Sequence, residues 1–146
     1  MRETIKKLGL EQGINEMVTL YKRIPKSGEI VPDDAIILQV LFWQMKTKLS
    51  DMVTKAERYE LDTKQKRDNL DVDIQSTSEE KSEAAKQRVA RADKSWRALQ
   101  DQRLEAGVLT EYLKMKRSDF EQAVYVMRAI LTYGRKDQES MPTQEI

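Results

Sequence analysis

Residues 38–59 read LQVLFWQMKTKLSDMVTKAERY, and the spacing of their apolar side chains decides the fold. These side chains recur at alternating steps of four and three residues: Leu38, Phe42, Met45, Leu49, Met52, Ala56 and Tyr59. Such steps form a heptad pattern, which places one apolar seam along a helix that packs against another helix. Because residues 34–74 contain no Gly or Pro, we expect one long helix over that range. The next seam positions, Thr63, Lys66 and Leu70, are mostly polar, so the pattern weakens toward the end of the helix.

A second long helix is predicted over residues 79–133, after the polar break QSTS at residues 75–78. Within this region Ser76 with Glu79, or Thr77 with Glu80, has the spacing of a capping box. The predicted seam is Ala85, Val89, Ala92, Trp96, Leu99, Arg103, Ala106, Thr110, Leu113, Arg117, Phe120, Val124, Met127 and Leu131. Gly134 is expected to end the helix as a left-handed cap. Residues 135–146 are polar, and we expect them to form a flexible tail.

The first residues, 1–24, are predicted to be a helical segment that Gly9 and Gly13 interrupt or loosen and Pro25 ends. Pro25-Lys26-Ser27-Gly28 reads as a turn, and residues 32–34 (PDD) as a helix start with Asp as the cap. Folding the chain about residue 77 would set Tyr59 near Trp96 and Phe42 near Tyr112. The sequence therefore predicts one all-α domain over residues 1–146. It is a long antiparallel helical hairpin with a coiled-coil-like stalk and a short N-terminal helix packed at the head.

Composition argues against catalysis. The chain has no Cys and no His, which removes thiolate chemistry and the commonest general base and metal ligand near neutral pH. It also lacks the common phosphate-binding and hydrolase motifs. The acidic pairs Asp33-Asp34 and Glu79-Glu80 have ligand chemistry for a divalent metal, but acidic residues at predicted helix starts are better explained by the helix dipole. We therefore expect no catalytic residue, no metal and no cofactor.

Hydropathy predicts a cytoplasmic protein. No apolar run approaches the ~20 residues that a membrane span requires, and the N-terminus lacks the apolar core of a signal peptide. We accordingly expect no membrane partner.

Basic side chains follow both long helices, although 26 basic and 25 acidic residues leave a net charge of only +1. Pairs three residues apart project from one helix face, and the aromatic residues Tyr59 and Trp96 lie near them in sequence. Cations beside aromatic rings suit single-stranded nucleic acid, which needs neutralised phosphates and stacked bases. The predicted contacts are Lys55, Arg58, Lys64, Lys66, Arg67, Arg91 and Lys94. The alternative is an ordinary solvated face, because acidic residues such as Asp51 and Glu57 are interspersed.

Self-association is the second binding prediction. Arg103 and Arg117 occupy seam positions, where polar residues set register or oligomeric state and buried charges require partners. Trp96 and Phe120 lie on the same seam, and the four residues form the predicted oligomer interface.

Several segments resemble the UvsY-like recombination mediators of tailed phages. They are residues 55–59 (KAERY), 80–83 (EKSE), 92–94 (ADK), 113–120 (LKMKRSDF) and 127–129 (MRA). The resemblance covers about the last two thirds of the chain. It implies a phage protein in the host cytoplasm, forming a ring-like homo-oligomer that binds single-stranded DNA. Such a protein assists DNA recombination by loading a recombinase onto strands covered by single-strand-binding protein.

In this comparison Lys55 and Arg58 match the basic helix that contacts DNA. The alternative function is a coiled-coil structural, assembly or inhibitor protein that acts through protein–protein contacts.

Overall fold

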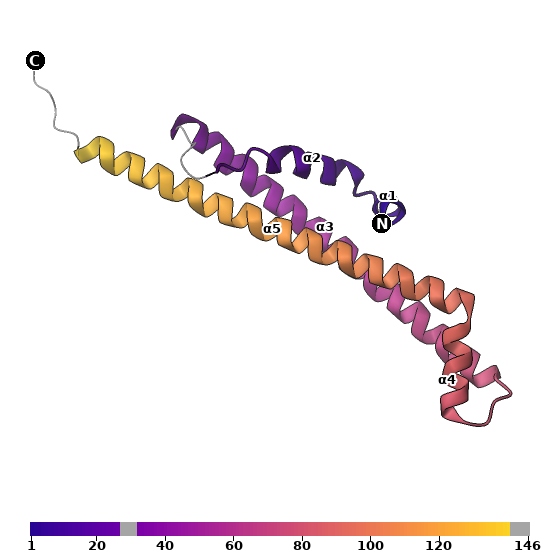
Figure 1. Ribbon diagram of the computed structural model, residues 1–146. Helices are drawn as coiled ribbons and strands as arrows, with labels where there is room; N and C mark the ends of the chain where they lie inside the picture. The colour runs from indigo at the N-terminus through magenta and orange to yellow at the C-terminus, as the bar shows by residue number, and fades with distance from the viewer. Residues whose placement is uncertain (27–31, 141–146) are drawn as a thin grey trace, which may run out of the picture. The chain divides into compact units, whose positions relative to one another are not determined.

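The computed structural model describes residues 1–26 and 32–140, all of whose regular structure is helical. The helices are α1 (Arg2–Lys7), α2 (Glu11–Tyr21), α3 (Pro32–Thr77), α4 (Glu83–Ala92) and α5 (Lys94–Ser140), as Figure 1 shows. The two long helices, α3 and α5, pack against each other in opposite directions. The predicted all-α antiparallel hairpin with a short N-terminal helix is thus confirmed.

The chain divides into two compact units. The first unit contains residues 1–10 and 52–113, and the second contains residues 11–51 and the chain from residue 114 onward. Each unit holds one part of α3 and one part of α5, so each has its own antiparallel pair of helix segments.

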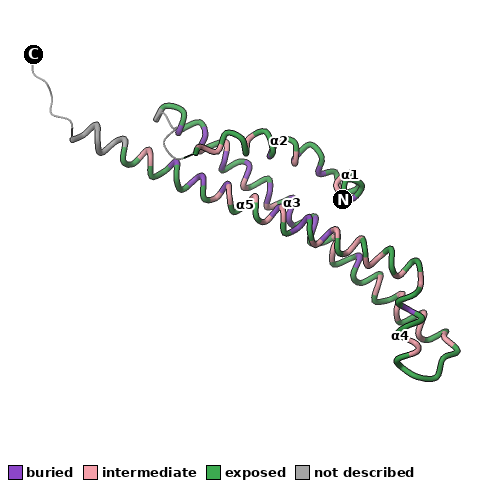
Figure 2. Tube along the Cα trace, viewed as in Figure 1, coloured by how far each residue is buried: buried purple, intermediate pink, exposed green. Residues whose placement is uncertain are grey.

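Large side chains fill the core of the second unit. Phe42 of α3 packs on Phe120 of α5 with ring centroids 5.7 Å apart, and both rings are fully buried. Met17 of α2 is also fully buried, as are Leu49 and Met127. The predicted seam of α3 is confirmed here, because Leu38, Phe42, Met45 and Leu49 are all buried. Figure 2 shows buried segments recurring along α3 where it runs beside α5.

The core of the first unit mixes small and polar side chains with larger apolar ones. Ala56, Thr63, Ala106 and Thr110 are buried at the helix contact, with Leu109 as one of the larger members. The hydroxyl groups of Thr63 and Thr110 donate to the carbonyl oxygens four residues earlier, each at 2.8 Å. These bonds satisfy the hydroxyls, so burying them leaves no orphaned donor.

The N-terminal segment is interrupted at Gly9, as predicted, and forms two helices. Gly9 has φ +67°, a left-handed conformation that Gly adopts at little cost, and it separates α1 from α2. Gly13 does not interrupt α2 and is buried within it. α2 ends at Tyr21, four residues before Pro25. Residues 27 and 28 of the predicted turn lie outside the described residues.

The helix boundaries of the long hairpin differ from the prediction in several places. Pro32 opens α3, and Asp33 and Asp34 lie in its first turn. The predicted helix over residues 79–133 is divided into α4 and α5. α5 also continues past Gly134 to Ser140, so Gly134 does not end the helix; residues 141–146 of the predicted tail lie outside the described residues.

The predicted capping boxes are wrong because α3 continues through Thr77. Ser82 caps α4 instead, where its Oγ accepts from the backbone N–H of Ala85 at 3.1 Å. Asp93 lies between α4 and α5, and its carboxylate accepts from the backbone N–H of Trp96 at 3.0 Å. Glu79 and Glu80 consequently precede the helix start and are not in its first turn.

The register of the hairpin is also different from the prediction. Arg67 bonds to Gln100 and Phe42 packs on Phe120, so the predicted pairs Phe42 with Tyr112 and Tyr59 with Trp96 do not form. The midpoint in sequence of the pair Arg67 and Gln100 lies between residues 83 and 84, later in the chain than the predicted bend at residue 77. The shift follows from the loop and the extra helix α4, which lengthen the connection between α3 and α5.

Candidate functional site

The predicted nucleic-acid contacts all fall within the first unit. Lys55, Arg58, Lys64 and Lys66 lie on α3 and are exposed. Arg91 near the end of α4 and Lys94 at the start of α5 are exposed as well. Six of the seven predicted cations therefore present their charge to solvent.

Three of these cations share one face of α3. Lys55, Arg58 and Lys66 lie within an arc of about 80° on a helix of 3.6 residues per turn, beside the arc that holds the buried Ala56 and Thr63. Between residues 55 and 66, Asp62 falls within the same arc, so three positive charges and one negative charge give this stretch of the face a net charge of +2. We call Lys55, Arg58 and Lys66 the basic face. Lys64 projects from a different side of the helix.

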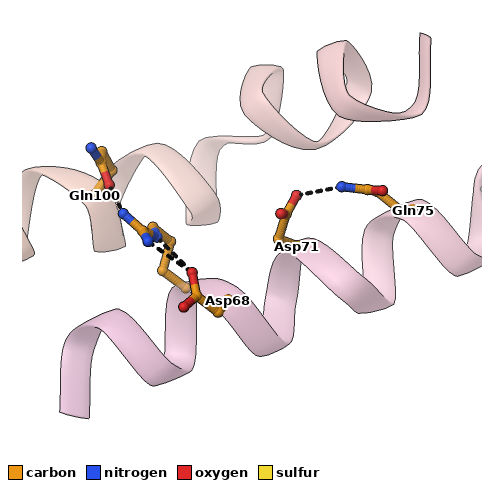
Figure 3. A network of polar contacts seen from close by, with 5 residues as sticks. Asp68, Asp71, Gln75 and Gln100 are labelled. Carbon is orange, nitrogen blue, oxygen red and sulfur yellow. Dashed lines mark hydrogen bonds and ion pairs between the residues drawn. The ribbon is translucent and has the colours of Figure 1, made fainter. Parts of the chain in front are cut away.

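Arg67 is not a free cation. Its guanidinium donates to the side-chain oxygen of Gln100 on α5 at 2.5 Å and to the carboxylate of Asp68 at 2.8 and 3.1 Å, as Figure 3 shows. The side chain is half-buried by these contacts. Arg67 joins α3 to α5 within the chain, so less of its charge is available to a phosphate than in the six exposed cations, and its nucleic-acid contact stays a prediction.

The two aromatic residues near the cations are partly covered. Tyr59 is half-buried, and the ammonium of Lys7 lies 5.3 Å from the centre of its ring. Trp96 is half-buried, and its indole N–H is buried without a hydrogen-bond partner. Neither ring offers a fully open face for stacking a base, so this surface would bind nucleic acid mainly through its positive charge.

The predicted oligomer interface is divided between the units. Phe120 is 0% exposed and packs on Phe42 and Tyr21, so it is a core residue of the chain and not a contact for a neighbour. Arg117 is half-buried in the second unit. Arg103 is half-buried in the first unit, where its Nε lacks a partner. It lines an open groove of about 450 Å³ with Leu104, Gly107 and Val108.

The sequence reasoning missed an exposed apolar face on α3 in the second unit. Ile36, Ile37, Val40 and Trp43 are 58%, 59%, 52% and 49% exposed, and we call them the outer apolar face. The detectable pattern was present in residues 35–45 (AIILQVLFWQM), which contain no charged residue. The heptad pattern accounts only for the buried seam of this run and does not account for the apolar residues on the opposite side of the helix.

Ion pairs mark the end of this run. Lys46 contacts Glu121 at 3.4 Å, and its ammonium lies 4.7 Å from the centre of the Trp43 ring. Lys48 bonds to Glu16 of α2. The hydrogen bond and the charge of Lys48 hold the pKa of the Glu16 carboxyl below its ordinary value.

Neither a cluster of metal-ligating side chains nor a membrane-spanning helix occurs among the described residues. Across residues 1–26 and 32–140, no three acidic side chains gather where they could hold a metal ion. Over the same residues, no helix has the length and apolar character needed to cross a membrane.

Comparisons with protein-family models, with curated proteins and with solved structures return no match. The resemblance to the UvsY-like mediators therefore rests on the quoted sequence segments alone.

Proposed function

We propose that this protein works by binding: it self-associates and holds single-stranded DNA through the basic face of the first unit. The observation that carries the proposal is the exposure of Lys55, Arg58 and Lys66 on one side of α3. Exposed cations on one helix face neutralise phosphates, which supply most of the affinity for nucleic acid.

Avidity explains how a chain with net charge +1 could bind a polyanion. A single basic face with a net charge of +2 is a weak binding site for a polyanion. When several copies assemble, the second and later contacts become intramolecular, and the combined affinity exceeds that of one site by orders of magnitude. The sequence resemblance supports a further role, in which the assembled protein helps to load a recombinase onto strands covered by single-strand-binding protein.

Binding of a labelled oligonucleotide across a salt series tests the proposal. We expect affinity to fall with rising salt, with a slope of about 0.7 per phosphate contact on single strands. The double variant Lys55→Ala with Arg58→Ala should bind at least tenfold more weakly and reduce that slope. The matched control is Lys22→Ala with Arg23→Ala, which removes two exposed cations directly after α2 and should bind as the parent does. Absence of binding at low salt, or equal losses in both double variants, contradicts the proposal.

The second candidate function is a structural or assembly protein that acts only through protein contacts. The outer apolar face favours it, because exposed apolar side chains grouped on one helix commonly mark a protein contact. Under this function, Lys55→Ala with Arg58→Ala keeps full activity and oligomer size. Loss of activity at unchanged oligomer size favours DNA binding instead.

A further inference from the structure

The start of α3 is apolar on both sides. Its inner side is buried through Ala35, Leu38 and Phe42, whereas its outer apolar face is about half exposed. A helix that is apolar all round is normally covered on all sides. The outer apolar face therefore requires a second partner beyond the core of its own unit.

We infer that this partner is a second copy of the chain, docked antiparallel on the same face with Val40 opposite Val40. The inference rests on the self-association in the proposed function and names the surface for it. Three members of the face are self-complementary because Ile37, Val40 and Trp43 are symmetric about residue 40, and Ile36 lies beside them. In an antiparallel pair Ile37 of one copy meets Trp43 of the other, and the same contact occurs twice.

Charge selects the antiparallel direction. Asp33 and Asp34 are exposed in the first turn of α3, and Lys48 follows the apolar run. Antiparallel docking brings Asp33 of one copy near Lys48 of the other, and the ammonium of Lys48 has donors beyond its bond to Glu16. Parallel docking would place the acidic starts of both helices together, which is repulsive.

The flanking charge also argues against a lipid surface as the partner. Helices that lie on membranes carry Lys and Arg along their polar face to attract anionic headgroups. The outer apolar face instead begins beside two carboxylates, which anionic headgroups repel.

The contact is small and must be weak when it acts alone. Stable interfaces bury roughly 800 Å² on each partner, more than four half-exposed side chains supply. We therefore expect a pair that forms in a concentration-dependent way. Because the face pairs with itself, it joins two chains or two assemblies, whereas a ring is built from head-to-tail contacts between different surfaces.

Cysteine cross-linking of the full chain tests the inference directly, because the parent has no Cys. Val40→Cys should form a disulfide-linked dimer of twice 17.0 kDa under mild oxidation at about 100 µM chain, a concentration suited to a weak interface. The matched control is Val72→Cys, which is 66% exposed in the first unit and should cross-link far more slowly. A mixture of Ile37→Cys and Trp43→Cys chains should yield the mixed dimer in preference to either self-linked dimer. Self-linked Ile37→Cys as the main product would overturn the antiparallel register.

Val40→Glu provides a second readout that needs no cross-link. It places two carboxylates opposite each other at the centre of the pair, so the dimerisation constant from sedimentation equilibrium should weaken at least tenfold. If the protein assembles and binds DNA but neither variant at residue 40 behaves as expected, the inference fails while the proposed function stands. A monomer at every concentration overturns both the inference and the self-association. The protein can also be tested for co-sedimentation with vesicles of mixed neutral and anionic lipid. If it co-sediments and Val40→Glu abolishes this binding, the partner of the outer apolar face is a membrane and not a second copy.

Discussion

The two units use the same two long helices but bury very different side chains. In the second unit the contact of α3 with α5 is made by Phe42, Phe120 and Met127, all fully buried. In the first unit the corresponding positions include Ala56 and Ala106. Heptad spacing is enough to pair the helices in both units, whereas the volume of the seam side chains sets how much each pairing contributes to stability. Fully burying one large apolar side chain contributes about 1.5–3 kcal/mol, and an alanine contributes much less.

The largest expected effect comes from emptying the aromatic core. Phe120→Ala removes a fully buried ring that contacts both Phe42 and Tyr21, and we expect a loss of about 3–5 kcal/mol in the free energy of unfolding. Urea denaturation followed by circular dichroism measures it. Val108→Ala, 58% exposed on α5, is the control and should change the free energy by less than about 0.5 kcal/mol. Equal losses in the two variants would show that the second unit does not depend on its aromatic core.

The seam could be predicted from the sequence because a strong apolar repeat leaves one helix face to bury. Leu38, Phe42, Met45 and Leu49 were assigned to the core and are buried. The hairpin register could not be predicted, because the seam from Ala85 to Leu99 is apolar throughout and gives no sign of the division at Asp93. The spacing of apolar residues in two helices does not show where the chain between them reverses direction.

A smaller effect, confined to the first unit, is expected at the start of α4. Ser82→Ala removes the oxygen that accepts from the backbone N–H of Ala85, and loss of such a cap costs about 1 kcal/mol. Hydrogen exchange should show faster exchange of amides in Glu83–Ala92, with amides around Phe42 unaffected. Ser95→Ala, an exposed position inside α5, is the control and should leave both regions unchanged. Faster exchange throughout both units would contradict the independence of the two cores.

The candidate site was less predictable than the fold. Exposure of Lys55 and Arg58 follows from their place off the seam, so the helical period was sufficient to predict it. The role of Arg67 was not predictable, because its bond to Gln100 depends on the register that the sequence left open. Phe120 was assigned to an interface although it belongs to the core, because a seam pattern does not distinguish a neighbour within the chain from one outside it.

Replacing Gly107 should strengthen the first unit slightly. In α5 this glycine faces Glu60, and an added Cβ would lie 3.2 Å from the Glu60 carboxylate oxygen, the movable end of a long side chain. Alanine favours the helix by about 1 kcal/mol over glycine, so we expect Gly107→Ala to stabilise by up to that amount after Glu60 shifts. The midpoint of thermal unfolding measures it. Gly107→Val is the control, since its branched side chain should clash and reverse the sign; stabilisation by both variants would show that the helices do not approach closely there.

The smallest effect concerns the exposed ion pair of the second unit. The bond and charge of Lys48 lower the pKa of Glu16, so Lys48→Met should move that pKa upward toward its ordinary value. A carboxyl with a lowered folded pKa stabilises above its unfolded pKa, and this contribution disappears as pH falls through the folded pKa. Lys48→Met should therefore flatten the acid dependence of stability only slightly, because both side chains are over 40% exposed and screened by water. Carbon-detected NMR titration of the Glu16 carboxyl gives the pKa directly, with Lys22→Met as the control that should leave it unchanged. If the Glu16 titration is unchanged in Lys48→Met, the ion pair does not hold α2 on α3. Buried side chains such as Met17 would then hold α2 alone, and the second unit would depend still more on its apolar core.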